Sequence, residues 1–308
     1  MELKLPYGLK NDELVSIKDV EGGLACNCIC PACKEQLIAR KGAIKIHHFA
    51  YYKSVDCLGG LETALHKLSK EIIAKSKTFK TPALYYPNTT YEIYEETEIP
   101  VDNVTLETRM DEIIPDIVIE SKGKKLLVEI VVTNKVKFNK AQRIRSENLP
   151  TIVVYAKYIL ETLYTNKDFG LQDNLFQREL VNGARYKFWL HNPKIRIIKK
   201  KLLDNYAEVK LVQYFKSEYV GYYYFVEFCP LRKRTWNSGI NIGKPYAAIE
   251  NDCKKCEFCF SIVYKDIPYK RIRFHEFYSP PDHYTIPEKV YCIGYLKNDF
   301  RNLIKRLK

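Results

Sequence analysis

Apolar residues in the central part of the sequence recur first with a helical period and then with an alternating one. Residues 61–76 (LETALHKLSKEIIAKS) carry apolar side chains three or four positions apart, which puts them on one face of a helix. These positions are Leu61, Leu65, Leu68 and Ile72. Glu62, His66 and Lys70 follow one another at four-residue steps beside that face. The pattern predicts an amphipathic helix with a polar stripe.

Three strand-like runs follow this helix, and each either alternates or is rich in β-branched residues. They are 91–99 (YEIYEETEI), 115–120 (PDIVIE) and 125–133 (KLLVEIVVT). The turn sequence SKGK joins the last two as a hairpin. Residues 137–149 then read as a helix, and the wholly apolar run at 150–156 reads as a covered central strand. The order helix, three strands, helix, strand predicts an α/β fold of the α+β kind.

The flanking regions have weaker patterns. Residues 35–46 alternate around Gly42, which predicts a β-hairpin, and 169–189 predict a helix running into a strand. Two further strands are expected at 193–203 (PKIRIIKKKLL) and 218–229 (EYVGYYYFVEFC), and a short basic helix at 300–308. We therefore expect three domains: a β-rich module at 1–60, a core at 61–160 and a β-rich basic domain at 161–308.

Composition suggests the class of partner. The 308 residues are 46% apolar, enough for folded domains, and carry a formal net charge of +13 with 24 tyrosines. A polyanion, most often nucleic acid, suits this balance, although a lysine- and tyrosine-rich genome bias gives the same numbers. In the last third, basic residues interleave with aromatic ones, which suits single-stranded DNA but also fits a solvated face. The residues are Lys194, Arg196, Lys199, Lys200, Lys201, Arg232, Lys233, Arg234 and Trp236.

The sequence offers no secretory signal and no membrane span. The opening MELKLPYGLKNDELVSI has no long apolar stretch behind a basic start, and the longest apolar runs are strand-sized. We expect a cytoplasmic protein with no membrane partner. In that reducing compartment, the ten cysteines favour metal binding over disulfides.

The first cysteine cluster predicts a structural zinc site. Cys30 and Cys33 form a C-x-x-C turn, and the predicted hairpin returns the chain to it. The four expected ligands are Cys30, Cys33, His48 and Cys57. Cys26 and Cys28 are left over, either as alternative ligands or as plain buried thiols.

A second cluster near the other end predicts a second closed zinc site. Cys229, Cys253 and Cys256 are the firmest ligands. Cys292 is preferred as the fourth because its strand-like segment is able to pair with that of Cys229, and Cys259 is the alternative.

Two carboxylates in the predicted hairpin call for an explanation. Asp116 opens one strand, and Glu129 lies inside the other among apolar neighbours, where an unpaired carboxylate is costly. The hairpin is able to bring both side by side, as needed to hold Mg²⁺ or Mn²⁺ against a phosphate. The alternatives are that Glu129 meets a basic side chain, or that a one-residue change of register turns it to solvent.

Taken together, these segments resemble the CoiA-like competence protein family. The likeness extends from about residue 20 to 160 and is carried by CICPACKEQLIARKGAIKIHHFA, ETALHKLSK, PDIVIE and LLVEIVVTN. It implies a PD-(D/E)XK, restriction-endonuclease-like core of αβββαβ order, which the two zinc ribbon-like modules would flank. By the family pattern, Asp116 and Glu129 hold the catalytic metal, and Glu62 and His66 flank it from the first helix.

The chain departs from the family pattern at two positions. Val131 stands where the family usually has Lys or Gln, two residues after Glu129, and Tyr51 replaces the second histidine of HFAH. Lys135 is named as the catalytic lysine, while Lys137 and Lys140 stay open. The expected function is a metal-dependent DNA endo- or exonuclease in DNA uptake, processing or defence. The alternative is a catalytically inactive nucleic-acid-binding adaptor.

Overall fold

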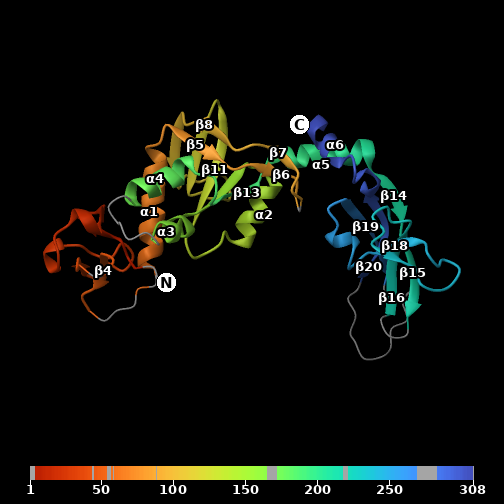
Figure 1. Cartoon of the computed structure of the whole chain (residues 1–308), viewed down its shortest axis with the longest axis horizontal. Coiled ribbons are helices and arrows are strands. Elements are labelled where there is room, and N and C mark those ends of the chain that lie inside the picture. Colours follow the sequence, from red (N-terminus) through yellow and green to blue (C-terminus); the bar gives the residue numbers. More distant parts are fainter. Residues whose placement is uncertain are drawn as a thin grey trace. The chain divides into compact units, whose positions relative to one another are not determined.

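The computed structural model describes residues 4–43, 45–53, 57, 59–87, 89–164, 172–217, 221–268 and 283–307. The chain forms two compact units (Figure 1). The first comprises Met1–Leu84 and Tyr94–Pro193, and the second comprises Tyr85–Ile93 and Lys194–Lys308. Apart from Tyr85–Ile93, the segments expected as an N-terminal module and a core thus lie in one unit, which continues past residue 160 to Pro193.

A five-stranded mixed sheet forms the centre of the first unit. Its strands are β9 (Asn103–Leu106), β10 (Ile117–Ser121), β11 (Lys124–Val131), β12 (Thr151–Tyr155) and β13 (Lys187–His191). They lie in the order β13-β12-β11-β10-β9, with β11 and β12 parallel and the other neighbours antiparallel. The β10–β11 hairpin turns tightly at Lys122 and Gly123, both with positive φ. The hairpin expected at SKGK is therefore confirmed.

Helices cover both faces of this sheet (Figure 1). Leu126, Val128 and Ile130 of β11 pack into a core shared with α1 (Gly60–Ala74), α3 (Ala156–Tyr164) and α4 (Gln172–Asn182). Leu127, which points the other way, packs with Ile144 of α2 (Phe138–Ser146). Because side chains alternate along a strand, Glu129 shares the α2 face with Leu127.

One expected strand of the core was wrong. The strand beside β10 is β9, and not residues 91–99. Those residues hold β7 (Glu92–Tyr94) and most of β8 (Thr97–Pro100), which pair with β6 (Leu84–Tyr85) and β5 (Thr78–Thr81). The acidic pair Glu95 and Glu96 separates the two short strands.

Short antiparallel pairs build the N-terminal part of the first unit. They are β1 (Tyr7–Lys10) with β2 (Glu13–Ser16), and β3 (Leu37–Arg40) with β4 (His48–Tyr51). The hairpin expected around Gly42 corresponds to β3 and β4. The 3₁₀ turns η1 (Ile17–Asp19) and η2 (Leu24–Cys26) complete this part, whose apolar residues join the core containing α1.

Among the described residues, two small sheets and two helices form the main part of the second unit, to which the β6–β7 pair also contributes. One sheet has the order β15-β16-β18-β17, and the other has the order β14-β20-β19. The strands are β14 (Glu208–Leu211), β15 (Gln213–Ser217), β16 (Gly221–Glu227), β17 (Arg234–Thr235), β18 (Pro245–Ala248), β19 (Cys259–Pro268) and β20 (His283–Cys292). The helices are α5 (Pro193–Tyr206), whose first residue closes the first unit, and α6 (Phe300–Leu307), with 3₁₀ turns η4 (Cys253–Lys255) and η6 (Gly294–Leu296).

Residues 193–203 are helical, which corrects the expected strand. Pro193 stands at the first helical position, where its missing N–H costs nothing. Ile198 and Leu202 are buried four residues apart, a helical and not an alternating spacing. Among the described residues, no helix is both long and apolar enough to cross a membrane.

Candidate functional site

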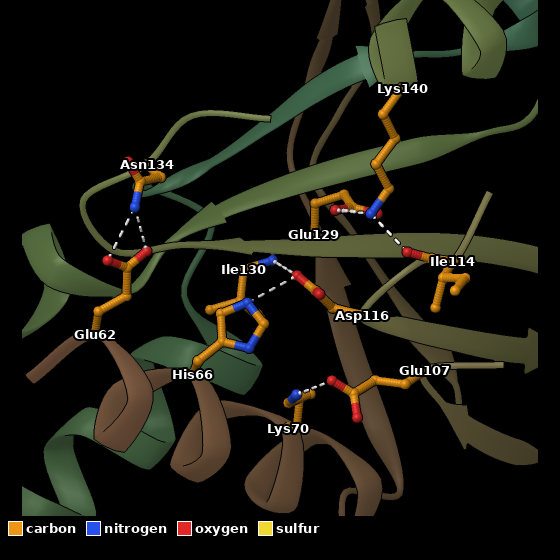
Figure 2. Close-up of polar contacts among 10 residues, drawn as sticks. All are labelled: Glu62, His66, Lys70, Glu107, Ile114, Asp116, Glu129, Ile130, Asn134 and Lys140. Carbon is orange, nitrogen blue, oxygen red and sulfur yellow. Dashed lines mark hydrogen bonds and ion pairs between the residues drawn. The ribbon is translucent and has the colours of Figure 1, made fainter. Parts of the chain in front are cut away.

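Asp116 and Glu129 lie side by side at the centre of the main sheet. The register pairs Ile117 with Val128, so Asp116 enters β10 next to Glu129 of β11. Figure 2 shows both carboxylates between α1 below and α2 above. The predicted register of the hairpin therefore brings the two predicted acidic residues together.

Asp116 is fixed by two donors at the same oxygen. His66 Nε2 lies 3.1 Å from Asp116 Oδ2, and the backbone N–H of Ile130 donates to that oxygen at 2.8 Å. Burial would raise the pKa of the Asp116 carboxyl, but the bond to His66 and the N–H of Ile130 outweigh it and lower that pKa. Asp116 is therefore held as an oriented anion.

Glu129 is only 4% exposed, and its two oxygens have different surroundings. Oε2 accepts a hydrogen bond from Lys140 Nζ at 2.6 Å, and that ammonium also donates to the carbonyl of Ile114 at 2.7 Å (Figure 2). Oε1 is buried without a hydrogen-bond partner among the residues described. Burial, together with the charge of Asp116, raises the pKa of Glu129 to about 7, although Lys140 opposes this.

Glu62 belongs to the same neighbourhood, on the first helix. It accepts hydrogen bonds from Thr133 Oγ1 at 2.5 Å and from Asn134 Nδ2 at 2.9 Å, just after β11. The bond from Thr133 is the largest influence on the pKa of Glu62 and lowers it. Glu62 and His66 line one open groove along α1, and Lys67 is among the other lining residues.

These residues fit a divalent cation. Mg²⁺ and Mn²⁺ prefer carboxylate oxygens, and two carboxylates converge here from neighbouring strands. A buried carboxylate oxygen without a donor is costly, and Glu129 Oε1 is such an oxygen, so a cation bound beside it would stabilise it. Both contacts of Asp116 use Oδ2 alone. The alternative foreseen for Glu129, a basic partner, is also present in Lys140.

Lys140 is the lysine that the structure brings to the candidate site, and the sequence had left it open beside Lys135 and Lys137. Val131, at the family position of the lysine, is buried. Lys135, named as the candidate, is exposed after β11, and Lys137 stands just before α2. Lys140, one turn into α2, reaches Glu129 because α2 covers that face of the sheet. The signal in the sequence was the helical pattern of 137–149, which turns Lys140 to the same side as the buried Ala141 and Ile144.

Three of the four ligands predicted for the first zinc site converge. The sulfurs of Cys30, Cys33 and Cys57 lie within 4.8 Å of one another, a group that could hold a metal ion such as zinc. Tyr51 completes their surroundings, since its hydroxyl is 3.3 Å from Cys30 Sγ. A Cβ at Gly60 would lie 2.4 Å from that hydroxyl, so the start of α1 packs directly on the cluster.

The other candidates of the N-terminal cluster lie apart from these three sulfurs. His48 is outside the group found among the described residues, and its Nδ1 lies 2.8 Å from the carbonyl of Ile46. Because side chains alternate along β4, His48 and Tyr51 face opposite sides. Cys26 and Cys28 are buried thiols that donate to the carbonyls of Leu37 and Cys26, respectively.

All five cysteines predicted for the second zinc site line one cavity of the second unit. They are Cys229, Cys253, Cys256, Cys259 and Cys292. Their sulfurs are more widely spaced than those of the first group, since no three of them lie within 4.8 Å of one another in the described structure.

An aromatic face covers one side of the sheet formed by β15, β16, β17 and β18. We call the five rings the aromatic face; they are Phe215, Tyr223, Phe225, Trp236 and Tyr246. Trp236 stacks on Tyr246 with ring centroids 4.2 Å apart, and Phe215 stacks on Tyr223 at 4.9 Å. Phe225 contacts a ring of each pair, since it packs against Phe215, Trp236 and Tyr246. Phe215 remains 41% exposed.

A family model matches the N-terminal part of the chain. Residues 9–59 match the family model of the N-terminal domain of the competence protein CoiA. The match supports a relationship to the CoiA-like family and includes the Cys30, Cys33 and Cys57 group. No curated protein and no solved structure matches the chain.

Proposed function

We propose that the first unit hydrolyses phosphodiester bonds of DNA with the help of Mg²⁺ or Mn²⁺. The supporting observation is the pair of adjacent carboxylates, Asp116 and Glu129, in which a buried oxygen has no donor and the other oxygen meets Lys140. With the short strands β5 to β8 inserted after α1, the elements of the main sheet follow in the order α1, β9, β10, β11, α2, β12, which supports a PD-(D/E)XK, restriction-endonuclease-like core.

The residues of the site have separable roles. When bound, the divalent ion would supply a water of lowered pKa and stabilise charge on the attacked phosphate. Asp116 and Glu129 would hold it, and His66 keeps Asp116 ionised and oriented. Lys140 would orient the attacking water and stabilise the developing negative charge on phosphate oxygens. Glu62, fixed by Thr133 and Asn134, would take part from the first helix.

A cleavage assay with metal and chelator arms tests this function. Pure full-length protein is incubated with single-stranded DNA, double-stranded DNA and RNA in Mg²⁺, Mn²⁺ or chelator. We expect DNA cleavage that requires metal and is lost in Asp116→Ala. A parent protein that never cuts under any of these metals would remove the nuclease assignment.

Two lysines provide a matched pair for the same assay. Lys140→Met removes the ammonium that contacts Glu129, and Lys135→Met removes an exposed ammonium nearby. We expect Lys140→Met to lose cleavage by about 100-fold or more, the scale for removal of one electrostatic donor in an active site. Lys135→Met should cut like the parent. The reverse result would restore Lys135 as the catalytic lysine.

A DNA-binding adaptor without catalysis is the second candidate, and the aromatic face favours it. Base stacking on exposed rings is how single-stranded DNA is bound without sequence preference. The second unit supplies positive charge for the phosphates, since residues 194–308 contain 23 Lys and Arg against 12 Asp and Glu. Under this candidate the parent protein binds single-stranded DNA tightly but leaves it intact in every metal arm.

The match to a CoiA domain suggests a competence-related role in DNA uptake or processing. Structural zinc at Cys30, Cys33 and Cys57 would tie the N-terminal part to the start of α1, which carries Glu62 and His66. The zinc would thus support the geometry of the hydrolytic site without taking part in the chemistry. Action on intracellular DNA in the cytoplasm is the setting we propose.

A further inference from the structure

Five cysteines from separate elements of the second unit enclose a space the size of one ion. Cys229 follows β16, Cys253 lies in η4 and Cys256 directly follows that turn. Cys259 opens β19 and Cys292 closes β20, where the two are register partners. The cavity between the five has a volume of about 20 Å³, enough for a single water-sized particle.

Geometry distinguishes three of the five thiols. Cys253 and Cys256 form a C-x-x-C turn, in which the N–H of Cys256 donates to the carbonyl of Cys253 at 3.1 Å. Cys292 Sγ accepts a hydrogen bond from the backbone N–H of Gly294 at 3.3 Å. Cys229 and Cys259 line the same cavity and complete the five.

Two lysines, Lys210 and Lys233, line the same cavity. Four thiolates with one Zn²⁺ carry a net charge of −2, which the two ammonium groups would offset.

We propose that this cavity binds one zinc ion through Cys253, Cys256 and Cys292, with either Cys229 or Cys259 as the fourth ligand. Zinc in structural sites takes four ligands in a tetrahedron, and this cavity is lined by five cysteines, one more than the ion needs. Binding would draw the widely spaced sulfurs together. The site would be structural, would leave one thiol unused, and does not depend on whether the first unit cuts DNA.

The zinc content of full-length variants tests whether Cys229 and Cys259 can replace each other as the fourth ligand. Protein purified without added metal is analysed for zinc, with the Cys30, Cys33 and Cys57 group as an unchanged reference. We expect Cys253→Ala to lose about one equivalent. Cys229→Ala and Cys259→Ala should each keep the parent content, and the double variant should lose about one equivalent.

Two results would overturn the proposal. Unchanged zinc in Cys253→Ala would mean that the cavity holds no ion. Loss of one equivalent in Cys229→Ala or Cys259→Ala alone would mean that the ligand set is fixed and the two thiols do not exchange.

Alkylation of the parent protein gives a readout that needs no variant to fold. Native protein is treated with a thiol reagent with and without chelator, and the modified cysteines are identified by mass spectrometry. We expect Cys253, Cys256 and Cys292 to be protected until the chelator is added, and Cys229 and Cys259 to be partly modified before it. Equal rates at all five with and without chelator would contradict a bound ion.

Discussion

The contact between Glu129 and Lys140 brings an ammonium group to the candidate site. The chain has Val131 where a lysine is usual in the family that it resembles, and Val131 is buried. Lys140 brings an ammonium from α2 to within 2.6 Å of Glu129 on the same face of the sheet. The positive charge beside Glu129 therefore comes from α2, since β11 has a valine at that position.

The two carboxylates should differ in what they contribute to folding. Asp116 satisfies the N–H of Ile130 and pairs with His66, so Asp116→Ala leaves a backbone donor without its partner. We expect a loss of about 1 to 3 kcal/mol in the free energy of unfolding.

Glu129→Gln removes a negative charge that burial disfavours, on a carboxylate whose Oε1 has no donor. The metal-free variant should therefore melt at or above the parent temperature at pH 8.

Thermal melts in chelator, beside the cleavage assay, measure this difference. Both variants should fail to cut DNA, because both remove a ligand of the proposed metal. A Glu129→Gln variant that melts many degrees below the parent would instead indicate that Glu129 serves the fold through Lys140.

At the residue scale, Lys187 leads to a second prediction, which concerns the dependence of stability on pH. Its side chain is 2% exposed, donates to the carbonyls of Lys80 and Val181 at 2.8 Å, and lies over the ring of Phe79. Burial lowers the pKa of Lys187 from 10.5 to about 7. Between these values the unfolded chain binds more protons, so stability should rise with pH, by at most about 1.4 kcal/mol per pH unit.

Urea unfolding at pH 7, 8 and 9 measures this rise. Lys187→Met should lack the contribution, so the parent should gain stability relative to the variant as pH increases. The same cysteines titrate in both proteins, so their contribution cancels when the two stability profiles are subtracted. Parallel profiles would show that Lys187 keeps its proton in the folded state.

At the scale of elements, the sequence predicted best where the pattern was long. The helix at 61–76, the SKGK hairpin and the strand at 150–156 correspond to α1, β10–β11 and β12. Each has a sustained period and a clear boundary. The placing of Asp116 beside Glu129 followed from the hairpin turn, because a two-residue turn fixes the register.

The elements that were missed are short or depend on tertiary contacts. β9 has four residues, too few for its sequence to mark it as a strand. Its pairing with β10 in the structure identifies it. The β-branched residues of 193–203 suggested a strand, while burial of Ile198 and Leu202 on one helical face favoured α5. Lys140 could not be chosen over Lys135 without the packing of α2 on the sheet. Nor could the sequence show that Tyr51 faces the first cysteine group.

The junction between α1 and the first cysteine group gives a prediction at this scale. Gly60→Ala would bring a methyl group to 2.4 Å from the Tyr51 hydroxyl and 3.2 Å from Cys30 Sγ. We expect about one zinc equivalent less in this variant. Gly59→Ala is the matched control, since its Cβ would meet only Ala32 at an ordinary 3.5 Å. Equal zinc in both variants would show that the helix start does not confine the metal group.

For the whole molecule, the net charge is distributed unevenly along the chain. Residues 194–308 carry +11 of the formal charge of +13, and the preceding residues are nearly neutral. The aromatic face and this charge therefore belong to the same part of the sequence. Phosphate attraction and base stacking make separable contributions to binding, because only the first depends strongly on salt.

Salt titration of single-stranded DNA binding should separate these contributions. For the parent, log K should fall linearly with log salt, with a slope of roughly −0.7 per phosphate contact, because binding releases counterions. Trp236→Ala should weaken binding by about 1 to 3 kcal/mol at every salt concentration and leave the slope unchanged. Lys244→Ala, which removes an exposed charge opposite Trp236, should make the slope shallower by about one contact. Ile240→Ala, a change at a 96% exposed loop residue close to Trp236, is the control and should bind like the parent.

Affinity that stays flat from low to high salt would exclude a polyanion as the partner. Unchanged affinity in Trp236→Ala would exclude stacking on this face.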